Sequence, residues 1–194
     1  MLKGKRVADS NLETAKAVDL ASVELNYDEF RKLSRNANMS PNERIGFPDA
    51  YRNGYEEAIF ADICQKLPAL CGYERVVVDI GPGCAGLPRM LIDLCERNRH
   101  RLVLVDSAEM LDQLPDAPHV VKVSGPYPGN QREIEAAAGG KVDALLCYSV
   151  LHYIYVDTNL FDVIDRVMEL LGHGGDALFG DIPNVSKRKR FFSS

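Results

Sequence analysis

Hydrophobic and polar positions follow two different patterns, and the change comes near residue 73. Before it, apolar residues are spaced as in helices and charged residues are frequent, so we expect a helical extension, or lid, over residues 1–72. Ser10 is placed to cap a short helix that runs to about Ala21, and residues 27–33 predict one or two further turns.

The second half of this extension predicts a loop followed by a longer helix. Residues 36–48 are rich in Asn, Ser, Pro and Gly, which favours a loop. From Asp49, apolar residues recur at every fourth position, as on one face of a helix, and Pro68 ends the pattern. The expected buried face consists of Tyr51, Tyr55, Ile59, Ile63 and Leu67.

From Arg75 onward, short apolar runs alternate with helical stripes. Continuous apolar strands are typical of a sheet that is covered on both faces. The expected strands are 76–78, 102–105, 119–123, 143–148 and 177–180. The expected helices are one with Pro88 in its first turn, one over 131–138, and one after Asp157 that buries Leu160, Phe161, Ile164, Val167, Met168 and Leu171. Repeated β-α-β units predict an α/β fold, a doubly wound, mostly parallel sheet with helices on both faces.

Composition narrows the class of protein. The 194 residues carry a formal net charge of −5, which argues against a general polyanion-binding surface, so we expect no nucleic-acid partner. The longest nearly apolar stretch, 144–156, falls short of the roughly 20 residues that a membrane-spanning helix needs. The basic N-terminus is not followed by an apolar segment, and the five cysteines form no C-x-x-C pair. We therefore expect a cytoplasmic protein with reduced thiols and no metal site.

A glycine-rich loop carries the strongest chemical signal. The apolar run 76–78 leads through Asp79 into Gly81, Gly83 and Gly86, and a helix follows. Such a loop brings bare backbone N–H groups close to a ligand, because no Cβ holds the ligand away. Asp106 closes the second expected strand, 20 residues past Gly86, where an acid accepts hydrogen bonds from both hydroxyls of a ribose.

The identity of the nucleotide-like ligand depends on Asp79. The glycine spacing also fits the dinucleotide fingerprint, so an NAD(P)-dependent oxidoreductase stays open as an alternative. A pyrophosphate is disfavoured beside a carboxylate, however, whereas a ligand with an ammonium or sulfonium group is favoured. The Tyr-x-x-x-Lys pair of one oxidoreductase class is also absent after the fourth expected strand.

Four stretches together resemble the class I (Rossmann-like) S-adenosylmethionine-dependent methyltransferases. The sequence Asp79-Ile80-Gly81-Pro82-Gly83 is similar to the family's first motif, acid-x-Gly-x-Gly, and Asp106 matches the acid of the second. Residues 143–153 look like the fourth motif, and residues 170–178 look like the usual approach to the fifth strand. The resemblance covers about residues 73 to 183 and implies a Rossmann-like cofactor-binding domain over 73–194.

By this resemblance the cofactor is S-adenosylmethionine, with the glycine loop along its methionine part and Asp106 on its ribose. The implied cofactor-binding residues are Asp79, Gly81, Gly83, Asp106, Ser107, Ser124 and Tyr148. Met110 is a candidate for packing on the adenine, and Arg52 and Tyr51 lie in the helix that lids the cofactor in this family.

Two departures from the family pattern stand out. The family often has an acid after the third strand, whereas this chain has Val123-Ser124-Gly125-Pro126, so Ser124 or a backbone carbonyl has to meet the adenine amine. Only about a dozen residues follow the fifth expected strand, so we expect a truncated domain without the family's sixth and seventh strands.

The resemblance implies methyl transfer to a small molecule. The segment after the fourth strand lacks Asn/Asp-Pro-Pro-Tyr and Pro-Cys, which disfavours adenine-N6 and cytosine-C5 methylation. His152 and Asp181, at the ends of the fourth and fifth strands, are the candidate general bases for a hydroxyl acceptor. Tyr148, Tyr153 and Tyr155 are candidates for lining its pocket.

The basic run Lys187–Arg190 and the preceding Asp181-Ile182-Pro183-Asn184 faintly resemble methyltransferases of bacterial surface-polysaccharide clusters. This resemblance implies a sugar or sugar-nucleotide acceptor. A non-catalytic cofactor-binding relic of the fold remains the alternative to an enzyme, and the oligomeric state is left open.

Overall fold

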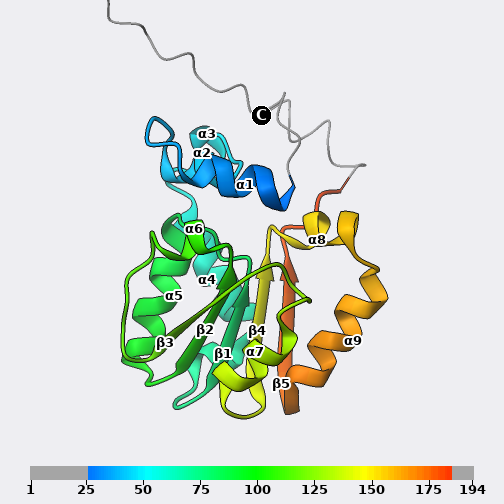
Figure 1. Cartoon of the computed structure of the whole chain (residues 1–194). Helices are drawn as coiled ribbons and strands as arrows, with labels where there is room; N and C mark the ends of the chain where they lie inside the picture. Colours follow the sequence, from blue (N-terminus) through cyan, green and yellow to red (C-terminus); the bar gives the residue numbers. More distant parts are fainter. Residues whose placement is uncertain (1–25, 185–194) are drawn as a thin grey trace, which may run out of the picture.

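The computed structural model describes residues 26–184, and it contains one parallel sheet with helices on both faces (Figure 1). The strands lie in the order β3-β2-β1-β4-β5, and every neighbouring pair is parallel. Their bounds are β1 Val76–Ile80, β2 Arg101–Asp106, β3 Val120–Ser124, β4 Val142–Tyr148 and β5 Leu171–Gly180. The predicted fold class is confirmed.

The helices fall into two groups along the chain. Those before the sheet are α1 Tyr27–Ser34, α2 Pro41–Arg44, α3 Asp49–Arg52, α4 Glu56–Lys66 and the short 3-10 helix η2 Pro68–Cys71. Those between the strands are α5 Gly86–Arg97, α6 Ala108–Leu111, α7 Gln131–Ala138, α8 Leu151–Asp157 and α9 Leu160–Leu170. The predicted helix from Ser10 to Ala21 and the basic run at 187–190 lie outside the described residues.

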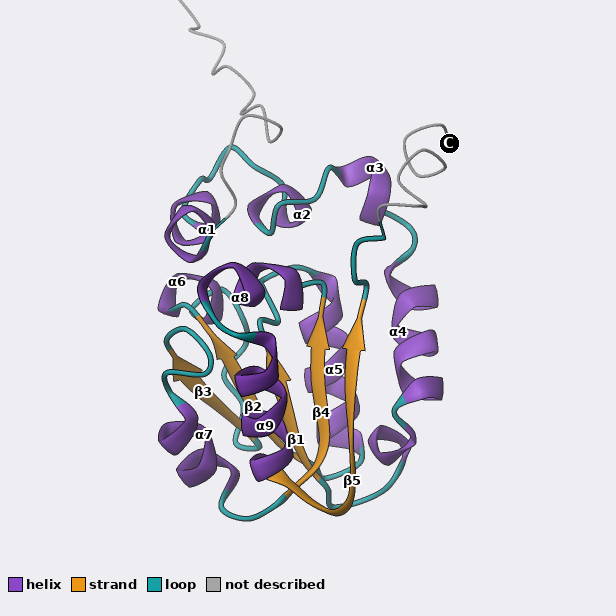
Figure 2. Ribbon diagram, turned by 90° about the vertical axis from the view of Figure 1, so that its right-hand side faces the viewer, coloured by secondary structure: helices purple, strands orange, loops and turns teal. Residues whose placement is uncertain are grey.

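Successive residues of each strand point to opposite faces, and this builds two cores. Val77 belongs to a core with α4 and α5, whereas Val78 belongs to a core with α7 and α9. Both valines are fully buried, which explains why the strand reads as a continuous apolar run. Figure 2 shows the two helix layers on either side of the sheet.

The first helices occupy a different place. In Figure 1, α1, α2 and α3 lie across the edge of the sheet at which the strands end. A parallel sheet gathers its carboxyl ends at this edge, and ligands bind there in open α/β folds. Within residues 26–184, no helix combines the length and apolar character that a bilayer span requires.

Two predictions for the segments before the sheet were wrong. The region 36–48 contains the helix α2, which begins with a capping box between Ser40 and Glu43. The expected continuous helix from Asp49 is split into α3 and α4, because Gly54 has a φ of +83°, which a right-handed helix does not accommodate. As a result Tyr55 is 59 % exposed, while Ile63 keeps its predicted buried place.

The predicted face of α9 was partly wrong, because Val167 is buried as expected but Phe161 and Met168 are not. The helix buries Val163, Val167 and Leu170, whereas Phe161 is 74 % and Met168 62 % exposed. Apolar residues occupy most faces of this helix, so the helical spacing of apolar residues alone does not determine which face packs against the sheet. The strand that follows begins at Leu171, earlier than predicted, and a bulge interrupts its pairing with β4 between Val142 and Ala144.

Candidate cofactor site

A cavity of about 410 Å³ opens at the carboxyl edge of the sheet, between the strand ends and the first helices. This volume is within the range of about 300–1,000 Å³ that is usual for small-molecule sites. Of the nine predicted site residues, the lining includes Gly81, Gly83, Asp106 and Tyr148. Among residues 26–184, the lining does not include Asp79, Ser107, Ser124, His152 or Asp181.

The glycine loop needs glycine for two reasons. Gly81 and Gly83 have φ values of +68° and +67°, a left-handed conformation that strains other residues. A Cβ on Gly81 would also lie 2.6 Å from Val150 Cγ2, and one on Gly83 would lie 2.7 Å from Ile45 Cγ2. The loop therefore packs tightly between the end of β4 and the segment after α2.

Asp106 is tied to this loop. Its Oδ2 accepts a hydrogen bond from the Gly83 N–H at 2.9 Å, and its Oδ1 accepts one from the Ser107 N–H at 2.7 Å. Burial raises the pKa of Asp106 from 3.8 to about 6, and the hydrogen bonds from Gly83 and Ser107 oppose the rise. At neutral pH the carboxylate is ionised, and it lines the cavity, as a ribose-binding acid must.

The two serines serve other roles in the described structure. The Ser107 side chain is buried and caps α6, because its Oγ accepts a hydrogen bond from the Met110 N–H at 3.3 Å. Ser124 ends β3 with its side chain exposed, while Gly125 and Pro126 line the cavity in its place. Met110, the candidate for packing on the adenine, also lines the cavity and is 2 % exposed.

Asp79 is a buried acid directly before the glycine loop. It is 4 % exposed, and within residues 26–184 no group donates a hydrogen bond to its carboxyl. Burial, and then the negative charge of Asp106, raise its pKa from 3.8 to about 8. The folded protein therefore holds a proton on Asp79 at neutral pH, and a nearby cation would favour its loss.

Glu56 is a site residue that the sequence analysis missed. Its Oε1 accepts a hydrogen bond from the Gly86 N–H at 3.0 Å, so it caps α5 at the end of the glycine loop, and it lines the cavity. A Cβ on Gly86 would overlap Glu56 Oε2, so a larger residue there would displace the Glu56 carboxylate. Nothing in the local pattern of residues 56–66 indicates this contact, since the partner is 30 residues away.

Arg52 also lines the cavity and joins two strand ends. Its Nη2 donates to Ser149 Oγ at 2.6 Å and to Asp181 Oδ2 at 3.0 Å. The guanidinium carbon lies 4.1 Å from the centre of the Phe47 ring. Ser149 and Asp181 have φ values of 64° and 52°, so both strand ends hold a strained backbone at this contact.

The second candidate base, His152, lies in α8. Its Nδ1 is buried and has no hydrogen-bond partner within the described residues, and its ring centre lies 3.9 Å from that of Tyr153. Burial lowers the pKa of His152, and the charge of Asp181 opposes this effect. The imidazole is therefore neutral at physiological pH. Tyr148 and Tyr153 line the cavity, as the sequence analysis proposed for an acceptor pocket, whereas Tyr155 is 61 % exposed.

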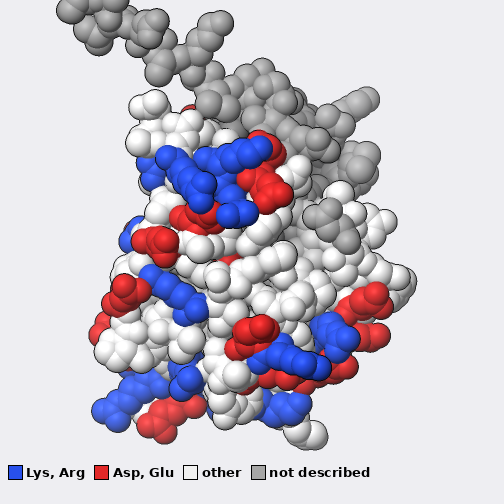
Figure 3. Space-filling model, in the orientation of Figure 1, with Lys and Arg blue, Asp and Glu red and all other residues white. Residues whose placement is uncertain are grey.

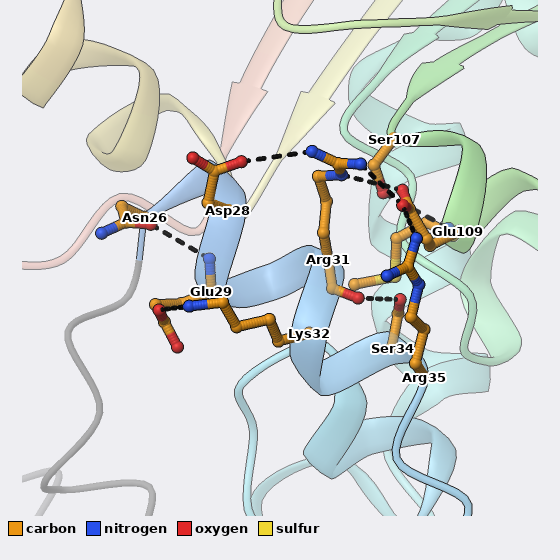
Figure 4. Close-up of polar contacts among 10 residues, drawn as sticks. Asn26, Asp28, Glu29, Arg31, Lys32, Ser34, Arg35, Ser107 and Glu109 are labelled. Atoms are coloured by element: carbon orange, nitrogen blue, oxygen red, sulfur yellow. Dashed lines mark hydrogen bonds and ion pairs between the residues drawn. The ribbon is translucent and has the colours of Figure 1, made fainter.

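The helix α1 covers the cavity with Tyr27 and Phe30. Ion pairs also join it to α6, the helix that follows Asp106. Figure 4 shows the contact: Arg31 donates two hydrogen bonds to the Glu109 carboxylate, at 3.0 and 2.8 Å, and Arg35 makes a further ion pair with it. Figure 3 shows basic side chains gathered over this helix, with acidic ones beside them. These ion pairs lower the pKa of Glu109 to about 2, so the contact persists at neutral pH.

The sequence matches no protein-family model and no curated protein sequence. Among solved structures, the chain is similar to the N-methyltransferase NodS from Bradyrhizobium japonicum WM9, with a TM-score of 0.55 and 18 % identity over 73 % of this chain and 75 % of that one. It is also similar to precorrin-6y C5,15-methyltransferase from Geobacter metallireducens GS-15, with a TM-score of 0.48 and 16 % identity over 70 % and 66 % of the two chains.

A third similar structure is coclaurine N-methyltransferase bound to N-methylheliamine and SAH, with a TM-score of 0.46 and 13 % identity over 82 % and 46 % of the two chains. The likeness to NodS is a likeness of fold. The chain has the class I S-adenosylmethionine-dependent methyltransferase fold, as its motifs predicted.

Proposed function

We propose that this protein is an S-adenosylmethionine-dependent methyltransferase that acts on a small molecule. The observation that carries the proposal is the pair of acids around the glycine loop: Asp106 on the loop at the cavity wall and the buried Asp79 before it. An ionised acid suits the ribose hydroxyls, and buried acids favour a ligand that brings its own positive charge. Glu56 adds a third acid at the same end of the cavity.

Methyl transfer from a sulfonium is an in-line displacement. A lone pair of the acceptor forms a bond to the methyl carbon, the S–C bond breaks, and its electron pair stays on sulfur, which becomes the neutral thioether. The protein positions the two reactants and excludes water. The cover formed by Tyr27 and Phe30 of α1 serves both tasks.

A small, hydroxyl-bearing acceptor is part of the proposal. The modest cavity volume and the net charge of −5 support a small molecule rather than a nucleic acid. A hydroxyl must lose its proton to a base. His152 is neutral, which is the protonation state that this role needs, and Asp181 is the alternative, although it already accepts hydrogen bonds from Arg52 and Ser149. Neither residue is among the cavity-lining residues within 26–184, so the acceptor has to reach past the lining to meet the base.

The proposal is tested by thermal unfolding with S-adenosylmethionine, S-adenosylhomocysteine, NAD and NADP in parallel. A ligand that binds only the folded protein adds about 2.7 kcal/mol of stability at a hundredfold excess over its Kd. We expect a rise in Tm with the two adenosyl ligands alone. A rise with NAD or NADP, or with none of the four, would reject the proposal.

A further inference from the structure

The guanidinium of Arg52 is buried but only partly used. The side chain is 5 % exposed, and both hydrogen bonds that the guanidinium donates, to Ser149 and Asp181, come from Nη2. Within residues 26–184, no group accepts a hydrogen bond from Nε or Nη1. Arginine carries five N–H donors, so three remain for a ligand.

Within residues 26–184, Nε and Nη1 are not among the fully buried side-chain atoms that lack a hydrogen-bond partner, and Arg52 lines the cavity, so a ligand in the cavity can reach these donors. The Phe47 ring covers one face of the guanidinium plane at 4.1 Å, so further partners have to approach in that plane. Asp181 does not remove the need for them: it contacts Nη2 alone, and its own side chain is 46 % exposed to solvent. An oxyanion from the cavity is the partner that satisfies both the charge and the donors.

The position of Arg52 separates this anion from the ribose end of the cofactor. Asp106 ends β2, whereas Ser149 and Asp181 follow β4 and β5. In the order β2-β1-β4-β5, these ends are roughly 10 and 14 Å from the end of β2, at about 4.8 Å per strand. The acids Asp106 and Glu56 line the ribose and glycine-loop side. Among the cavity-lining residues within 26–184, Arg52 is the single basic side chain of the Lys or Arg type.

We propose that Arg52 binds a carboxylate of the methyl acceptor, so that the acceptor is a small organic acid. The wall around the guanidinium is aromatic, with Phe47 against it and the Tyr148 ring centre 5.9 Å away, and both line the cavity together with Phe30 and Tyr153. These walls suit a planar, apolar body behind the carboxylate. The proposal rests on the proposed function, since it assumes that the cofactor fills the other end of the cavity.

The test uses the full chain saturated with S-adenosylhomocysteine and titrated calorimetrically with benzoate or with benzamide, its neutral analogue of the same shape. We expect benzoate to bind at least about tenfold more tightly than benzamide, the preference that a charge-assisted hydrogen bond to Arg52 confers. Arg52→Met removes this preference. Arg99→Met is the matched control, because Arg99 also lies over an aromatic ring, at 5.5 Å from Tyr73, but near the opposite edge of the sheet; it leaves the preference unchanged.

A second pair of ligands shows whether Arg52 binds the carboxylate of the acceptor or the carboxylate of the cofactor. 5′-Methylthioadenosine lacks the amino-acid part of S-adenosylhomocysteine. We expect Arg52→Met to bind both adenosyl ligands within about twofold of the wild-type protein, which also shows that the variant is folded. Weaker binding of S-adenosylhomocysteine alone would assign Arg52 to the cofactor and overturn the proposal.

Two further results bear on the proposal without any variant. Equal affinity of the wild-type protein for benzoate and benzamide would overturn the carboxylate assignment, while the proposed function stands. If the wild-type protein binds neither S-adenosylhomocysteine nor methylthioadenosine, the proposed function fails, and the acceptor assignment fails with it.

Discussion

Replacing Asp79 by Asn isolates the energetic consequence of burying an acid beneath the glycine loop. In the unfolded chain this carboxyl ionises near its ordinary pKa of 3.8, whereas in the folded protein burial raises the pKa to about 8. Between these pH values the folded protein retains a proton that the unfolded chain has released. Raising the pH therefore favours unfolding, by about 1.4 kcal/mol for each pH unit.

Asparagine does not ionise, so the variant lacks this dependence. From about pH 5 to about pH 8, we expect the free energy of unfolding of Asp79→Asn to rise relative to the wild-type protein by about 4 kcal/mol, three times the change per unit. The assay is urea denaturation followed by circular dichroism at several pH values, without ligand. Asp165→Asn, at an exposed position of α9, controls for the loss of one negative charge.

The same variant tests whether Asp79 favours a ligand that carries a positive charge. S-Adenosylmethionine carries a sulfonium charge and S-adenosylhomocysteine does not, so only the former gains from an ionised Asp79. In the wild-type protein, the preference for the methylated ligand rises as the pH approaches 8, and in the variant it stays constant. A stability difference that does not change between pH 5 and pH 8 would show that Asp79 ionises normally in the folded protein and would refute this reasoning.

Three further predictions concern the loop, its acid and the covering helix. Asp106→Ala lowers the affinity for S-adenosylhomocysteine by about 1–3 kcal/mol, because charge-assisted bonds are lost; an unchanged Kd in calorimetry would contradict the ribose assignment. Gly81→Ala costs about 1–3 kcal/mol of stability in thermal unfolding, since its φ is +68° and its Cβ meets Val150, and Val150→Ala in the same chain restores part of the loss. Glu109→Gln speeds hydrogen exchange of the α1 amides, because the ion pairs to Arg31 weaken; equal exchange rates in the two proteins would show that other contacts hold the helix.

Much of the sheet and of the glycine loop follows from short-range patterns. A run such as Val76–Val78 predicts a strand with both faces covered, and the structure buries Val77 and Val78. The glycines after it predict a tight turn, in which Gly81 and Gly83 adopt positive φ. The place of Asp106 follows as well, since a parallel neighbour strand ends beside the loop. The strand and the turn are determined locally, because the backbone preferences of glycine and of β-branched residues act within a few positions.

The tertiary structure alone decided the features that depend on distant partners. The buried stripe of α9 was one of several apolar stripes, and its contact with the sheet selected Val163 and Val167 over Phe161 and Met168. Glu56, which lies in α4 and caps the start of α5, was likewise beyond the sequence pattern. For Arg52, the resemblance implied a place in the lid but not its contact with the ends of β4 and β5. Their spacing along the chain is that of ordinary surface charges. They become site residues because folding brings together segments up to 129 residues apart, and periodicity carries no information about such pairs.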